Sequence, residues 1–243
     1  MDSLKITSKF TALLLLNAAA LGLTASDVSA IPRRTARSTS SAAIFVPPTD
    51  ETHSSSRAGG SRSTAACQQD SAAAALTAIA PQNRVGLTAA AQPTMLVYIP
   101  ETSAQQLYFS VKTAAGEGHY EAVLPITQTG SVTALSLPAE SPLALGTTYT
   151  WGVGLLCSAG QTDLPWVAGR IQRVPPLVAL PEAGVERAIA LGQAGLWYDA
   201  VSELSRAADD PLSASTVLGH WRELLSWTGA SAATAESILS ATD

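Results

Sequence analysis

The side chains best able to bind a metal are scattered along the chain. The three histidines, His53, His119 and His220, lie far apart, and no HxH, HExxH or CxxC spacing is present. A metal site needs two or more ligands brought together, and these spacings are the usual local sign of one. The sequence therefore predicts no metal site.

Residues for nucleophilic or cofactor chemistry also lack a recognisable setting. No GxSxG motif occurs, and Gly152-Val153-Gly154 has no third glycine of the dinucleotide-binding type. We therefore expect no catalytic and no cofactor-binding residues, and a protein that is not an enzyme. A carboxylate pair for glycoside hydrolysis stays open, because such pairs form only in the folded chain. The candidates, for which solvated loop charges are the simpler interpretation, are Glu117, Glu121, Glu140 and Asp163.

Five residues are candidates for an interaction surface. They are Trp166, Arg170, Arg173, Tyr198 and Asp199. An arginine in the predicted strand can form an ion pair with Asp199 or Glu203 of the helical region, which we favour, or offer its guanidinium to an anionic ligand. Adjacent helical residues point about 100° apart, so one of Trp197 and Tyr198 is expected in the core and Tyr198 on the surface.

The N-terminus has the pattern of an export signal. Lys5 and Lys9 precede an apolar run from Phe10 to Leu23, and Val28-Ser29-Ala30 offers small residues for cleavage. The run is short of the roughly 20 residues that span a bilayer, so we expect a signal peptide over residues 1–30 and no stable membrane anchor after its removal.

Export would place the protein in an oxidising compartment, periplasmic or extracellular. The two cysteines, Cys67 and Cys157, are then expected to form one disulfide. It would close a loop of about 90 residues, worth roughly 4 to 5 kcal/mol in the chain-entropy treatment.

Charge is distributed unevenly. The stretch Ile31–Ala66 has five arginines and two acidic residues, is rich in Ser, Thr, Ala and Gly, and is predicted to be a disordered basic linker. A weak attraction of this linker to anionic lipid or cell-wall polymer stays open. From Cys67 onward seven basic residues face fifteen acidic ones, a net charge of −8, which argues against nucleic-acid binding.

Residues 67–176 have the period of two that is typical of strands. In Tyr149–Cys157 the odd positions are Tyr, Trp, Val, Leu and Cys, and the even positions are Thr, Gly, Gly and Leu. One face of the strand is therefore bulky and the other is mostly small, which predicts the central strand of a sheet. Seven short strands predict an antiparallel β-sandwich of immunoglobulin-like proportions, without the immunoglobulin cysteine and tryptophan spacing. The expected strands lie within residues 75–80, 95–99, 107–112, 120–124, 132–137, 149–157 and 166–174.

Residues 177–243 switch to the helical period after Pro175-Pro176. Apolar residues recur every three or four positions from Trp197 to Ala208 and from Val217 to Leu225. Further helices are expected over about 182–193 and after Ser231, a suitable N-cap. The stretch Ala188–Ala200, with Pro211 after it, is similar to one tetratricopeptide repeat, so a small helical hairpin is predicted to pack on the sandwich or on a partner.

Several short motifs in order resemble a cyanobacterial family of exported proteins, the domain of unknown function 928. They cover Cys67 to about Gly229 and include Pro93-Thr94, Tyr149-Thr150-Trp151, Gly169–Val174 and Gly195–Ala200. The resemblance implies a location outside the cytoplasm and no particular activity.

Three functions are weighed. The first is a non-catalytic extracytoplasmic module that docks another exported or membrane protein of the cell envelope. The second is a polysaccharide- or cell-wall-binding module, which needs an exposed aromatic row, and the least supported is a hydrolase. An apolar groove on the helices would favour the first, and a deep pocket with two converging carboxylates would favour the last. The aromatic candidates are Tyr98, Tyr108, Tyr120 and Trp166.

Overall fold

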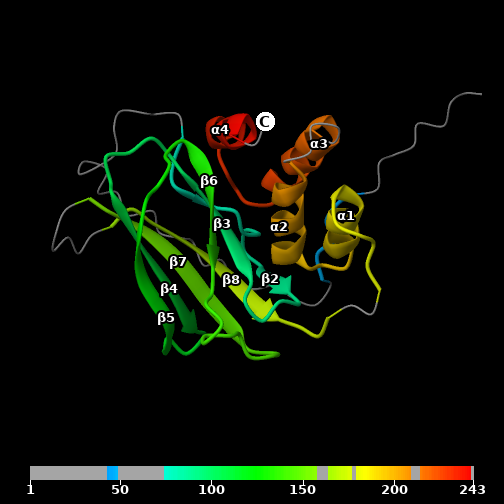
Figure 1. The fold of residues 1–243 in the computed structure, drawn as a ribbon, viewed down its shortest axis with the longest axis horizontal. Coiled ribbons are helices and arrows are strands. Elements are labelled where there is room, and N and C mark those ends of the chain that lie inside the picture. Colours follow the sequence, from blue (N-terminus) through cyan, green and yellow to red (C-terminus); the bar gives the residue numbers. More distant parts are fainter. Residues whose placement is uncertain (1–42, 49–73, 158–163, 177–178, 209–213, 242–243) are drawn as a thin grey trace, which may run out of the picture. The chain divides into compact units, whose positions relative to one another are not determined.

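The chain forms two β-sheets followed by four helices (Figure 1). The computed structural model describes residues 43–48, 74–157, 164–176, 179–208 and 214–241. These all belong to one compact unit, residues 41–243. The mainly β class with C-terminal helices is therefore confirmed.

The smaller sheet has three strands in the order β1-β3-β6, all antiparallel. They are β1 (Thr77–Ala78), β3 (Thr94–Ile99) and β6 (Ser131–Ser136). Strand β3 lies in the middle and is buried from Met95 to Ile99. Its length is limited by Pro93 and Pro100, since proline cannot donate to a sheet ladder.

The larger sheet has five strands in the order β2-β8-β7-β4-β5. They are β2 (Val85–Thr88), β4 (Gln106–Thr113), β5 (Gly118–Pro125), β7 (Thr148–Leu156) and β8 (Trp166–Arg173). Strand β7 is central, as its alternation predicts, and Tyr149, Trp151, Val153 and Leu155 are all buried. The opposite face of β7, which has the small residues Gly152 and Gly154, is also covered, because Trp166 lies over both glycines.

Two expectations about the strands were wrong. There are eight described strands rather than seven, the additional one being β2. Strand β2 pairs with β8 in parallel, so the larger sheet is not purely antiparallel. The sequence around Gly86 alternates too briefly to signal a strand, and its pairing is fixed by distant residues.

The helices are α1 (Val185–Gln193), α2 (Trp197–Ala207), α3 (Ala214–Leu225) and α4 (Ala232–Ala241). Helix α2 packs on β2 and β3, and α4 packs beside β6 (Figure 1). The expected N-cap of α4 is confirmed, because the Ser231 hydroxyl accepts the Thr234 N–H at 3.1 Å. One apolar core joins residues of both sheets with Trp197, Leu204, Trp221 and Leu224 of the helices.

The disordered-linker prediction was wrong for residues 43–48. Ile44 and Phe45 are 0% and 3% exposed and belong to the core. The folded body therefore includes a short segment that lies ahead of the predicted boundary at Cys67.

Candidate functional site

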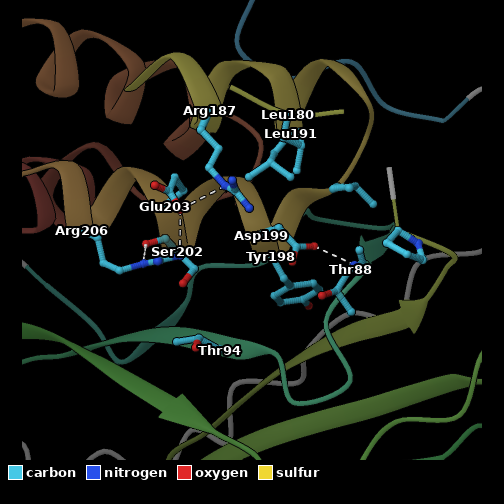
Figure 2. Close-up of a pocket in the computed structure, with 13 residues that line it drawn as sticks. Thr88, Thr94, Leu180, Arg187, Leu191, Tyr198, Asp199, Ser202, Glu203 and Arg206 are labelled. Atoms are coloured by element: carbon cyan, nitrogen blue, oxygen red, sulfur yellow. Dashed lines mark hydrogen bonds and ion pairs between the residues drawn. The ribbon is translucent and has the colours of Figure 1, made fainter. Parts of the chain in front are cut away.

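A cavity of about 300 Å³ lies between helices α1 and α2 and the strands β2 and β3 (Figure 2). Two carboxylates one helical turn apart, Asp199 and Glu203, both line it. A pair of carboxylates beside a cavity could take part in acid–base chemistry, so the hydrogen-bond partners of Asp199 and Glu203 matter.

Asp199 binds the turn that follows β2. Its Oδ2 accepts the N–H of Ala89 at 2.8 Å, and the Thr88 hydroxyl is a further partner. Burial raises the pKa of the Asp199 carboxyl above its ordinary value, and the hydrogen bonds from Ala89, Thr88 and Ala90 partly offset the shift. The group fastens β2 to helix α2.

Glu203 is held by three donors. Its Oε1 accepts the Gly184 N–H at 2.8 Å, and its Oε2 lies 2.9 Å from Arg206 and 3.7 Å from Arg187 (Figure 2). Only 5% of its side chain is exposed. Its charge is thus balanced, and it secures the start of α1, which has no side-chain N-cap.

The predicted ion pairs from strand β8 do not form. Asp199 and Glu203 take the partners just described, and Arg173 donates instead to the Leu143 carbonyl at 2.9 Å. The sheet is joined to the helices through the backbone of Arg170, whose carbonyl accepts the Tyr198 hydroxyl at 2.9 Å. Arg170 also lines a different groove, described below.

Tyr198 is a buried connector, not the surface contact that was predicted. It is 1% exposed, and its hydroxyl accepts Trp151 Nε1–H at 2.7 Å while donating to Arg170. Its ring fills the space beside Gly86, where a Cβ atom would lie 2.5 Å from the ring. Burial raises the pKa of the Tyr198 hydroxyl well above its ordinary value.

The segment Ala43–Pro48 lies in a groove formed by α1, α2 and α3. Ile44 N–H donates to Glu223 Oε1 at 2.9 Å, and Val46 N–H donates to the Gly192 carbonyl at 3.1 Å. The Phe45 ring forms T-shaped contacts with the rings of Trp197 and Trp227 at centroid distances of 4.8 and 5.4 Å. The segment is therefore held by both its backbone and its side chains.

Glycine 192 lets this segment approach the helix. A Cβ atom at Gly192 would lie 2.1 Å from the Ile44 carbonyl oxygen. Gly195 turns the chain between α1 and α2 with φ +79° and lies next to Pro48. We call the site that holds Ala43–Pro48 the seat; the small residues Gly192 and Gly195 of the repeat-like stretch form part of it.

A second, larger groove of about 820 Å³ runs beside the start of β8. Its walls include residues 75–78 and 80–84, residues 166–170 of β8, and the α3–α4 connection. Trp166 and Arg170, two of the predicted interaction residues, meet here. Arg84, which sequence reasoning missed, joins them because β2 lies parallel to β8.

Trp166 also forms an aromatic pair with Tyr108, at a centroid distance of 6.1 Å. The two rings lie in one row of the sheet, since Tyr108 pairs with Gly154 and Gly154 pairs with Trp166. Tyr120 packs against Phe109 instead, and Tyr98 is 4% exposed. Of the four aromatic candidates, two therefore share a half-exposed face.

The other candidate residues are dispersed. His119 contacts the Ser141 carbonyl at 3.3 Å, His220 is buried, and Glu121 pairs with Lys112 at 3.7 Å. Across the described residues there is no group of three or more His, Cys, Asp or Glu suited to a metal ion. Glu117 and Glu140 are exposed, whereas His53, Asp163 and Cys67 lie outside the described residues.

The predicted disulfide stays a prediction, since the position of Cys67 is not described. Cys157 directly follows β7, at the end of the central strand. The predicted signal peptide likewise lies outside the described residues. In the part of the chain that is described, no helix has the length and apolar character needed to cross a membrane.

Sequence comparison matches the chain to a protein family. A search of curated proteins found no relative of this chain. The match is to a family model that covers residues 57–238, which include every described strand and the helices to within a few residues of the end of α4. Because this span is most of the sequence, the chain belongs to the family described as Domain of Unknown Function (DUF928).

Proposed function

We propose that the protein is an exported, non-catalytic interaction module of the cell envelope that docks another exported or membrane protein through helices α1 to α3. The observation that carries this proposal is the seat of Ala43–Pro48. There the helices hold a short peptide segment by two of its backbone N–H groups and by an aliphatic–aromatic pair of side chains. A partner segment with the same chemistry fits the same seat.

The strength of this contact suits an exchangeable ligand. Burying Ile44 and Phe45 contributes roughly 1.5 to 3 kcal/mol each, before the cost of ordering the segment. A separate peptide must also overcome the loss of translational freedom, so its affinity is modest unless the chain's own segment is removed.

The absence of catalysis in this proposal is supported by the cavity of Figure 2. Both carboxylates that face it are engaged by donors of the protein itself, Asp199 by Ala89 and Glu203 by Gly184 and two arginines. Both carboxylates thus already hold parts of the protein together, and this structural role supports a non-catalytic module.

The finer architecture belongs to the same proposal. We infer a β-sandwich of immunoglobulin-like proportions that carries a helical hairpin similar to a tetratricopeptide repeat. The shared core of the two sheets and the tight α1–α2 connection at Gly195 support it. Export and the Cys67–Cys157 disulfide complete the proposal. Mass spectrometry of the non-reduced protein tests both, through the mass of the cleaved chain and through the linked cysteine peptides.

A synthetic peptide of residues 41–48 tests the docking function. We expect it to bind the full-length variant Ile44→Ser/Phe45→Ser, in which the seat is emptied, at least tenfold more tightly than the wild type. Adding Gly192→Ala to that variant should abolish binding, because the new methyl group occupies the place of the Ile44 carbonyl. Fluorescence anisotropy of the labelled peptide measures all three affinities.

Failure of the folded, emptied variant to bind the peptide would contradict the proposal. If that variant does not fold, hydrogen exchange of the wild type decides. The Ile44 and Val46 amides should exchange through a local opening of lower free energy than that of the β7 amides. Equal opening energies would show a fixed core segment without exchange.

Polysaccharide binding is the second candidate, favoured by the pairing of Tyr108 with Trp166 on one face of the sheet. Aromatic rings on a surface can stack on sugar rings. A glycan array tests it, with Tyr108→Ala as the variant that should lose the signal. Array binding together with failure of the peptide experiment would reverse the order of the two functions.

A further inference from the structure

The groove beside β8 has an open strand edge as its floor. Strand β2 pairs only with Arg170–Arg173, so among the described residues Trp166–Gly169 have no strand partner on that side, although Ala80 packs close to Gly169. The Leu155 N–H donates to the Pro165 carbonyl at 3.1 Å, and the antiparallel register then assigns residues 167 and 169 to the ladder with β7. The N–H and C=O groups of Trp166 and Ala168 therefore point toward the groove.

These edge groups are accessible to a ligand. Trp166 and Ala168 are both partly exposed and both line the groove. An exposed strand edge is a template for an added strand, because its unpaired donors and acceptors match those of any extended peptide.

The charged residues that line the groove set a second requirement for its ligand. Arg84 and Arg170 are the only charged residues in the described lining of the groove. Neither guanidinium has a carboxylate partner among the described residues; that of Arg84 lies 6.0 Å from the centre of the Trp227 ring. The chain from Cys67 onward has a net charge of −8. The groove, whose described lining has two arginines and no acidic residue, is therefore positively charged within an acidic protein.

We propose that this groove binds an extended acidic segment of a partner protein, which adds as a strand beside Trp166–Gly169 and places carboxylates against Arg84 and Arg170. The strand edge selects a peptide over a glycan, and the arginines select its charge. The groove is a different site from the helical seat, since none of the residues that contact Ala43–Pro48 line it, although Trp227 neighbours both Phe45 and Arg84. Binding here extends the proposed docking function without resting on it.

A peptide of alternating glutamate and valine, eight residues long and labelled with a fluorophore, is the probe for the full-length protein. We expect saturable binding that weakens as salt is raised, and no binding of the analogue in which lysine replaces glutamate. Arg84→Gln/Arg170→Gln should weaken binding at least tenfold. The matched control Arg222→Gln, on the exposed face of α3, should leave it unchanged.

The strand edge is tested separately by Ala168→Pro, with Ala168→Ser as its control. Proline removes an N–H that faces the groove and that the β7 ladder does not use, so binding should fall at least tenfold while circular dichroism is retained. If this variant does not fold, probes N-methylated on one or the other edge replace it, and only one of the two should bind.

Equal binding of the lysine peptide, or no effect of the arginine substitutions, would overturn the proposal. So would binding of an oligogalacturonate without binding of the acidic peptide, which would assign the groove to an anionic glycan. Unchanged affinity in Ala168→Pro, or equal binding of both methylated probes, would overturn the strand addition.

Discussion

Replacing Tyr198 by phenylalanine removes one hydroxyl group that joins helix α2 to two strands. The ring keeps its place beside Gly86, so no cavity is created. What is lost is the acceptor for Trp151 Nε1–H at 2.7 Å and the donor to the Arg170 carbonyl at 2.9 Å.

The cost is set by the groups left behind. Trp151 is 0% exposed, so its N–H cannot turn to water, and a buried unsatisfied group costs about 1 to 3 kcal/mol. The Arg170 carbonyl lies in the sheet and adds a smaller amount. We expect Tyr198→Phe to lower the free energy of unfolding by about 2 to 3 kcal/mol.

Urea denaturation followed by tryptophan fluorescence measures this change as a lower midpoint with an unchanged m-value. Tyr120→Phe is the matched control, since no hydrogen bond of the Tyr120 hydroxyl is present in the described structure, and it should change stability by less than about 0.5 kcal/mol. A loss in Tyr198→Phe no greater than that in the control would refute the reasoning.

Alkaline pH gives an independent check. The folded-state pKa of Tyr198 is raised above the ordinary value of 10.0, so its contribution is complete below pH 10.0. As pH rises further, the unfolded chain ionises first and the contribution is lost. The difference in stability between wild type and Tyr198→Phe should therefore shrink above pH 10.0.

Three further predictions concern other contacts. The folded-state pKa of Asp199 is raised above 3.8, so the stabilisation that this shift provides is complete below pH 3.8 and is lost as pH rises. In urea titrations between pH 3.8 and about 7, the wild type should therefore lose stability relative to Asp199→Asn. A constant difference between the two proteins would contradict this. Gly152→Ala places a methyl group 2.1 Å from the Trp166 ring and should cost about 1 to 3 kcal/mol, with a changed Trp166 fluorescence; unaltered stability and emission would count against the packing described. The non-reduced mature protein should show Cys67 joined to Cys157 by peptide mapping, and two alkylatable thiols would refute the disulfide.

The sequence predicted elements whose signal is local. The alternation in β7 identified a strand that is indeed central, and Ser231 identified the start of α4. Both signals come from residues next to one another in the sequence, so they can be recognised without knowledge of the fold. The C-terminal helices follow from the same kind of local period.

Features fixed by distant residues could not be predicted in this way. Strand β2 has four residues, and only its parallel partner β8 makes it a strand. Tyr198 was expected outside because a helix on a surface has one apolar face, whereas α2 is covered by the sheet on one side and by Phe45 with α3 on the other. Ile44-Phe45-Val46 was visible as an apolar triplet, but nothing near it indicates its seat.

The site residues show the same division. Trp166 and Arg170 were singled out as residue types for contact, and both line one groove. Arg84 reaches the same groove only because of the β2–β8 register, which the sequence does not state. The partners of Asp199 and Glu203 are backbone groups and arginines whose positions depend on the whole packing of α1, α2 and β2.

The seat of Ile44 has a consequence for the order in which the chain can fold. Its amide meets Glu223, 179 positions later, so the contact exists only once nearly the whole chain has been synthesised. Such long-range closure is slow, because the entropy of a large loop is lost before the contact is gained. We therefore expect the burial of this early segment to follow the formation of helix α3.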